Sequence, residues 1–174
     1  VAEGVYDGLT LGAEATAAAD GLEGVLRYDP MSMRPFMSYG EGDYAAHWLE
    51  VFSRTTTKPI FAHVNWFQRG DDGRFLWPGF GENSRVLEWI VDRVSGRAEA
   101  VETPIGLVPT TDAIDRTGLD LDDETMAVLL AVDPSSWSHE VALIDEHYSM
   151  IGDRLPKRLE AELDELRSRL DAAR

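Results

Sequence analysis

Residues 84–174 are mostly helical in their pattern of apolar positions, which favours helices packed against a core in this half of the chain. The clearest case lies at the C-terminal end, where five leucines share one face and predict a helix of four or five turns: Leu155, Leu159, Leu163, Leu166 and Leu170. A coiled coil with a partner is the alternative, but sustained heptads are missing. We therefore expect this face to pack against the rest of the same protein.

Two further helices are predicted upstream. The first has Asn83 or Ser84 as its N-cap, ends at Gly96, and presents one apolar face of five residues: Val86, Leu87, Ile90, Val91 and Val94. The second opens at Asp133-Pro134, a capping residue followed by proline at the first helical position. Its apolar face includes Trp137, Val141, Ile144, Tyr148 and Ile151.

Residues 1–80 are rich in glycine, proline and aromatic residues and contain only short apolar runs. The patterns predict, in chain order, a strand within Gly21–Tyr28, an irregular loop over Pro30–Gly42, a short helix over Tyr44–Val51, and a buried strand over Ile60–Phe67. Gly70–Gly73 has strong turn chemistry, so Arg74–Trp77 is expected to return as the second strand of a hairpin.

Charge excludes several classes of partner. The chain has 174 residues, enough for one domain, and a formal net charge of −16. This argues against binding nucleic acid or an anionic membrane surface. An anionic nucleotide could bind only in a locally neutral or basic pocket. No apolar run approaches the ~20 residues of a membrane helix, and the absence of cysteine suits a reducing cytoplasm.

Metal binding by this chain is not favoured. The four histidines, His47, His63, His139 and His147, are scattered, which is more typical of structural or surface positions. The acidic run Asp120–Glu124 lacks the ligand spacing of a calcium-binding loop. We expect it to begin a helix instead, where negative charge is favourable.

The segment Asn65–Arg85 concentrates aromatic residues beside a polar helix start. Its rings are Trp66, Phe67, Phe75, Trp77 and Phe80. Such rings could stack on a flat base, each stack contributing ~1–3 kcal/mol. The backbone N–H groups of Gly81–Asn83 could then meet guanine O6, and Glu82 or Asn83 could meet its donors. Alternatively, the hairpin is core and Asn83 merely caps a helix, which the residues alone slightly favour.

Several strings resemble, in order and spacing, the C-terminal region of GTP-dependent phosphoenolpyruvate carboxykinases. The most distinctive is FLWPGFGENSRVLEW at Phe75–Trp89, preceded by HVNWF at His63–Phe67. The others are the family-like elements Glu14–Ala19, Asp29–Phe36, His47-Trp48-Leu49 and Thr103–Gly106. The resemblance runs from about Tyr6 to the C-terminus and weakens after Pro109.

The resemblance implies a mixed α/β fold: the C-terminal part of the carboxykinase nucleotide-binding domain, with a β-hairpin and loops followed by outer helices. All of 1–174 would belong to it, with a mobile lid loop at 50–58, the guanine-binding segment at 63–85 and a helical tail at 123–173. Guanine would lie between Phe67 and Phe80. The implied nucleotide-binding set is Trp66, Phe67, Phe75, Phe80, Gly81, Glu82 and Asn83.

The full enzyme would convert oxaloacetate and GTP to phosphoenolpyruvate, carbon dioxide and GDP in gluconeogenesis. The resemblance places its Mn2+ and Mg2+ ligands and catalytic groups upstream of this chain, which also has no GxxxxGK[ST] phosphate loop. We therefore expect the chain alone to be inactive, and the full enzyme to be a cytoplasmic monomer that binds neither nucleic acid nor membrane. A stand-alone purine-binding module and a helical interaction domain are the alternatives.

At two places the sequence departs from the family pattern. Leu11 and Gly12 occupy the place where some members have a phosphate-contacting arginine, so no phosphate contact is assigned there. Ser38-Tyr39-Gly40 stands where the family has GYN, which predicts a locally altered loop.

Overall fold

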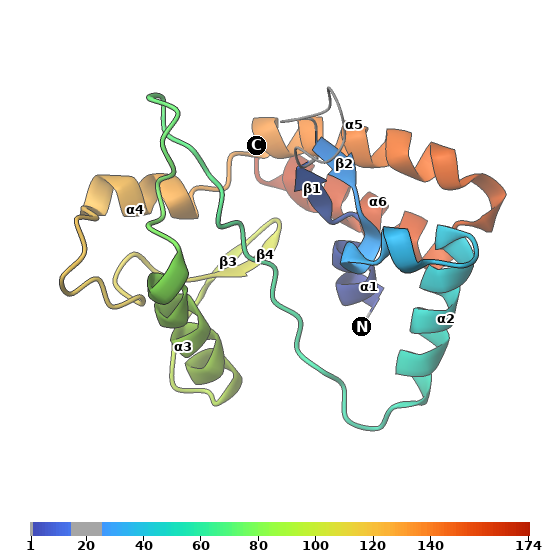
Figure 1. The fold of residues 1–174 in the computed structure, drawn as a ribbon, viewed down its shortest axis with the longest axis horizontal. Helices are drawn as coiled ribbons and strands as arrows, with labels where there is room; N and C mark the ends of the chain where they lie inside the picture. The colour runs from blue at the N-terminus through green and yellow to red at the C-terminus, as the bar shows by residue number, and fades with distance from the viewer. Residues whose placement is uncertain (1, 15–25) are drawn as a thin grey trace. The chain divides into compact units, whose positions relative to one another are not determined.

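The computed structural model describes residues 2–14 and 26–174, which form two compact units (Figure 1). The first unit comprises Val1–Phe61 and Ser135–Ala172, and the second Ala62–Pro134 with the last two residues. The described fold is mixed and mostly helical, with small two-stranded antiparallel sheets, consistent with the predicted α/β class. No helix in the described ranges is long and apolar enough to cross a membrane.

The first unit is built around its last helix. Its elements in chain order are α1 (Ala2–Leu9), β1 (Gly12–Glu14), β2 (Leu26–Tyr28), η1 (Pro30–Ser32), η2 (Arg34–Phe36), α2 (Glu41–Arg54), α5 (Pro134–Ile151), η4 (Gly152–Arg154) and α6 (Lys157–Ala172). β1 and β2 pair antiparallel, with Gly12 opposite Tyr28. α6 packs against α1, and all five leucines of the predicted stripe are buried. That prediction is confirmed.

The N-terminal helix α1 was not predicted, because its two glycines, Gly4 and Gly8, are poor helix formers. The fold requires them for close approach. A Cβ atom at Gly4 would lie 2.2 Å from the ring of Phe61, and one at Gly8 would lie 2.3 Å from the sulfur of Met31. One face of α1 still buries Val5, Tyr6 and Leu9, so tertiary packing outweighs the low propensity.

The second unit has a small core of its own. Its elements are η3 (Phe80–Glu82), α3 (Asn83–Val94), β3 (Val101–Thr103), β4 (Gly106–Val108) and α4 (Asp123–Leu130). The buried residues are Trp77, Ile114, Leu121 and Met126, with Trp66, Val86 and Trp89 among the partly buried residues around them. Asp122 caps α4 by accepting a 2.8 Å hydrogen bond from Thr125 N–H, as expected for the acidic run.

The predicted buried strand over Ile60–Phe67 is wrong. The segment is extended but irregular, and Ile60 is 67% exposed. β-Branched and aromatic residues favour a strand only where a neighbouring strand accepts the ladder hydrogen bonds, and no described strand lies beside this segment. The return strand at Arg74–Trp77 is likewise reduced to one antiparallel bridge between Arg69 and Phe75.

Helix predictions were more accurate, with one exception at the start of α3. Gly96 ends α3 with a φ of 71°, and α5 and α2 form as expected, α2 being longer at both ends. The predicted N-cap role of Asn83 or Ser84 is wrong, since Glu82 occupies that position and no side chain caps the helix. Ser84 donates to the Gly81 carbonyl instead.

Two predictions fall partly outside the described residues. In Gly21–Tyr28 the last three residues form β2, whereas residues 21–25 are not described. The family-like element Glu14–Ala19 is described only at Glu14. Over Pro30–Gly42 the predicted loop contains two short 3₁₀ turns before α2 begins at Glu41.

Candidate functional site

A tight turn brings two of the predicted pocket rings together. Gly70 N–H donates to the Arg74 carbonyl (2.9 Å), and Leu76 N–H donates to the Gln68 carbonyl (2.9 Å). The rings of Phe67 and Phe75 then meet edge to face, with centroids 5.9 Å apart. Phe67 is 70% exposed and Phe75 is 48% exposed, so this pair is not core.

Phe80 is the most exposed of the predicted rings, at 97%. Its φ of 49° places a bulky side chain in the left-handed region, a conformation that costs free energy and occurs at turns and at functional sites. Gly79, with a φ of 79°, allows the chain to enter this conformation. Among the described aromatic pairs Phe80 has no ring partner, so the structure does not close the predicted slot between Phe67 and Phe80.

The two tryptophans of the segment belong to the core. Trp77 is 6% exposed, and Trp66 packs, partly buried, against the cluster that contains it. The aromatic residues of Asn65–Arg85 therefore divide into two core rings and three exposed ones. Trp66, which the resemblance places in the pocket wall, supports the segment from inside.

The groups predicted to read a base edge are partly engaged within the protein. Glu82 N–H donates to the Gly79 carbonyl at 3.1 Å, and Asn83 N–H donates to the Phe80 carbonyl. In the described residues the Gly81 N–H has no such partner. The Asn83 side chain accepts a 2.8 Å hydrogen bond from Trp77 Nε1 through Oδ1.

Arg85 fastens the start of α3 to the loop at Asp115–Thr117. Its guanidinium donates to the carbonyls of Asp115 (2.8 Å) and Thr117 (3.0 Å), and its Nε contacts Glu82 Oε2 at 2.5 Å. The hydrogen bond that Arg85 donates to Glu82 raises the pKa of Arg85. The Thr117 hydroxyl and N–H lower the pKa of the Asp115 carboxyl, which keeps it charged. The sequence offered no signal for this arrangement, because Arg85 lies 30 residues or more from its loop partners.

The segment is locally neutral although the chain carries a net charge of −16. Between residues 65 and 85 three arginines (Arg69, Arg74 and Arg85) balance three acidic residues (Asp71, Asp72 and Glu82). The Arg69 guanidinium carbon lies 4.1 Å from the centre of the Phe75 ring, a cation–π contact. The local neutrality of this segment meets the condition stated for an acidic chain, that an anionic nucleotide could bind only in a locally neutral or basic pocket.

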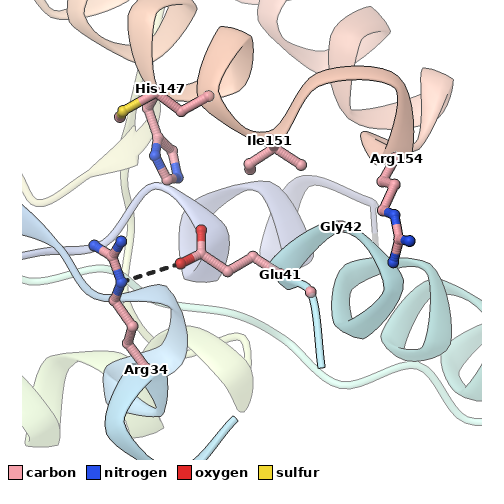
Figure 2. Close-up of a pocket in the computed structure, with 8 residues that line it drawn as sticks. Arg34, Glu41, Gly42, His147, Ile151 and Arg154 are labelled. Atoms are coloured by element: carbon pink, nitrogen blue, oxygen red, sulfur yellow. Dashed lines mark ion pairs between the residues drawn. The ribbon is translucent and has the colours of Figure 1, made fainter. Parts of the chain in front are cut away.

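A separate pocket of about 220 Å³ lies within the first unit (Figure 2). Arg34 pairs with Glu41 (3.2 Å) on one side of it, and Arg154 pairs with Asp43 (2.5 Å) on the other. His147 also lines the pocket, its ring stacked on Tyr28 at 4.1 Å and its Nε2 3.3 Å from the Leu9 carbonyl oxygen. None of the predicted nucleotide-binding residues lines this pocket.

The predicted lid segment 50–58 is only partly irregular. Glu50–Arg54 belongs to α2, and Thr55–Lys58 follows as exposed loop. The Lys58 ammonium donates to the carbonyls of Phe52 and Ser53 at the end of α2, at 2.5 and 3.5 Å.

Comparison of the sequence with known protein families shows which class of domain this chain is. A sequence profile described as the phosphoenolpyruvate carboxykinase C-terminal P-loop domain matches residues 1–169. The chain therefore belongs to this family of carboxykinase domains.

Individual relatives define the family more closely. The chain is 49% identical over 169 residues to a phosphoenolpyruvate carboxykinase [GTP] of Arthrobacter sp. (strain FB24), and 48% identical to that of Renibacterium salmoninarum. It is 47% identical over 173 residues to that of Neocallimastix frontalis. Each match covers 96–98% of this chain but 28% of the relative. The chain thus belongs to the GTP-dependent phosphoenolpyruvate carboxykinase family and spans little more than a quarter of the length of these relatives.

Proposed function

We propose that this chain is the guanine-recognising part of an enzyme that converts oxaloacetate and GTP to phosphoenolpyruvate, carbon dioxide and GDP. In that reaction the loss of carbon dioxide leaves an enolate, whose oxygen attacks the γ-phosphorus of GTP while GDP leaves. Catalysis of such transfers rests on positioning and electrostatics. The contribution of this chain is to position the nucleotide by its base.

One observation carries the proposal: Phe67, Phe75 and Phe80 are exposed on a neutral segment beside a helix start. Exposed phenylalanines grouped in one short segment mark a binding surface, because each exposes apolar area to water until something covers it. A flat base between Phe67 and Phe80 would cover both. Binding would therefore close the slot that is open in the described structure.

The polar groups beside Phe80 suit guanine. The Gly81 N–H and the Asn83 Nδ2 group are donors available for O6. Glu82 engages Arg85 through Oε2, which leaves Oε1 as an acceptor for the N1 and N2 donors of the base. A base lacking this pattern would leave buried polar groups unpaired, at about 1–3 kcal/mol each.

Catalytic groups and metal ligands are assigned to the rest of the enzyme. The described residues contain no cluster of three or more histidine, aspartate or glutamate side chains placed to bind a metal ion. The Mn2+ and Mg2+ ions implied by the family would be held by upstream residues. We accordingly propose that the 174-residue chain has no carboxykinase activity by itself, and that the complete enzyme is a cytoplasmic, monomeric enzyme of gluconeogenesis.

The proposed lid role narrows to Thr55–Lys58, the irregular and exposed part of 50–58. Opening and closing would require Lys58 to release the last carbonyls of α2. Lys58→Ala in the complete enzyme would then change kcat and KM together. Unchanged values of both would assign the lid to another segment.

The test uses the complete carboxykinase, expressed from its full reading frame, with Phe80→Ala and Asn83→Ala. We expect the KM for GTP to rise about five- to a hundredfold in Phe80→Ala, from the loss of one stacking ring. Asn83→Ala should lower the preference for GTP over ATP. Phe36→Ala is the matched control, since Phe36 is also an exposed phenylalanine (76%) but lies in the first unit.

Unchanged nucleotide affinity in both variants would exclude this base site. The reading frame upstream of Val1 provides an independent test. Its continuation into a phosphate loop ending in GK[ST] supports the enzyme, whereas a start codon adjacent to Val1 favours a stand-alone purine-binding module.

A further inference from the structure

The indole of Trp77 contacts the side chain that is proposed to read the base. Trp77 Nε1 and Asn83 Oδ1 are 2.8 Å apart. An indole N–H can only donate, so the atom of Asn83 that faces it must be the carbonyl oxygen and not the amide nitrogen. The hydrogen bond therefore determines which way round the carboxamide is held.

Neither partner can turn away easily. Trp77 is 6% exposed and packs with Ile114, Leu121 and Met126, so the core holds its ring in place. Asn83 is the first residue of α3, which Arg85 fastens to the loop at Asp115–Thr117. A reversed carboxamide would set its N–H groups against the indole N–H and leave a buried donor without an acceptor.

With Oδ1 held toward the indole, the opposite end of the Asn83 carboxamide is Nδ2, for which no hydrogen bond is found among the described residues. This group donates hydrogen bonds and cannot accept them. We propose that Trp77 is a positioning residue that fixes the Asn83 carboxamide with Nδ2 toward the base, and so selects bases carrying an oxygen at position 6. The inference rests on the base site proposed above.

The group at position 6 of the purine decides which orientation of the carboxamide fits. Guanine and hypoxanthine carry an acceptor oxygen at position 6, whereas adenine carries an amino donor there. A held Nδ2 matches the first two and opposes the third. A carboxamide free to reverse would offer Oδ1 to adenine and would discriminate little between them.

The experiment is the substitution Trp77→Phe in the complete carboxykinase, with kcat/KM measured for GTP, ITP and ATP. The ring is largely kept and the N–H is removed. We expect kcat/KM for GTP and ITP to fall by the same factor, about three- to tenfold for one hydrogen bond, while that for ATP does not fall. The GTP-to-ATP ratio then falls by that factor. An equal fall for all three nucleotides would mean that Trp77 serves only to pack the core, and would overturn the inference.

A second variant guards against misfolding of Trp77→Phe. Replacement of Trp77 by β-(3-benzothienyl)alanine keeps the shape of the indole and exchanges its N–H for sulfur. The same drop in the GTP-to-ATP ratio is expected, with an unchanged melting temperature. A ratio equal to that of the unmodified enzyme would overturn the inference.

Two substitutions at Asn83 separate this inference from the base site itself. If Asn83→Ala leaves the kinetics of GTP unchanged, the base-reading role fails, and with it the inference. If Asn83→Ala lowers the GTP-to-ATP ratio but Trp77→Phe does not, only the role of Trp77 fails. Asn83→Asp should favour ATP, because a carboxylate still accepts from Trp77 but presents an acceptor to the base. In the Asn83→Ala background, Trp77→Phe should change the ratio no further.

Discussion

Single residues of the same chemical type take opposite roles in this chain. Trp77 and Phe80 lie three positions apart, yet Trp77 is 6% exposed and Phe80 is 97% exposed. The difference arises from the backbone, because the positive φ angles of Gly79 and Phe80 turn the chain away from the core just after Trp77. Among the histidines, His147 has the structural role that was predicted for the scattered histidines. It is buried, its ring is stacked, and it is hydrogen-bonded.

His147 gives a prediction about pH. Burial lowers its pKa; Glu41 and the bond to the Leu9 carbonyl oppose this shift, and Arg34 adds to it. The unfolded chain takes up the proton near pH 6.5, whereas the folded chain does so at lower pH. The neutral His147 side chain therefore makes its full contribution to the free energy of unfolding above about pH 6.5. That contribution is lost as the pH falls through the pKa of His147 in the folded chain.

We expect the melting temperature of the chain to fall between pH 7.5 and pH 5.5, and His147→Gln to flatten that dependence. Thermal melts monitored by circular dichroism at both pH values measure it. An equal pH dependence in the variant would contradict the assignment to His147.

Among the elements, α6 is stabilised by its leucine face and α3 by only half of its apolar face. Leu159, Leu163 and Leu170 are at most 2% exposed. On α3, by contrast, Val86 packs against the core of the second unit, while Leu87 and Val91 are 53% and 58% exposed. The helical periodicity of apolar residues thus identifies both α3 and α6, but it does not show how much of each apolar face is buried by the rest of the chain.

Leu163→Ala in α6 should lower the free energy of unfolding of the chain by about 2–5 kcal/mol, because it removes apolar contacts and leaves a cavity. Glu160→Ala, on the exposed side of the same helix, should stay within about 0.5 kcal/mol of the parent. Urea denaturation of both variants measures the difference. Equal effects would show that the leucine face does not form the core of this unit.

At the scale of the whole molecule, α3 has an exposed row of apolar residues that the proposed complete enzyme would cover. The row consists of Leu87, Val91 and Val94, each more than half exposed. The chain spans 28% of the length of its relatives, so a large part of such an enzyme lies outside it. We expect that part to cover the row.

Leu87→Lys with Val91→Lys should therefore leave the melting temperature of the 174-residue chain nearly unchanged but lower that of the complete carboxykinase. Val86→Lys, which enters the core of the second unit, should lower both. Differential scanning calorimetry on the two proteins makes the comparison. If the double variant left the complete enzyme as stable as its parent, the row would be a solvent-facing surface.

What the sequence by itself determined was local. The periodic faces of α5 and α6, the stop at Gly96 and the helix start within Asp120–Glu124 depend on residues a few positions apart, and each formed as predicted. Motif order likewise identified the family, because it needs no knowledge of contacts. These features could be predicted since their physical causes lie within one or two turns of chain.

Only the tertiary structure decided features that depend on distant partners. Ile60–Phe67 has strand-forming residues but no neighbouring strand to complete a ladder. Gly4 and Gly8 disfavour a helix, yet the close approach of Phe61 and Met31 requires them in one. At the candidate site the aromatic composition was evident, but only the fold shows that Phe67, Phe75 and Phe80 are exposed while Trp77 is buried and Trp66 partly buried. The orientation of Asn83 followed from a hydrogen bond to a side chain that only the fold holds in place.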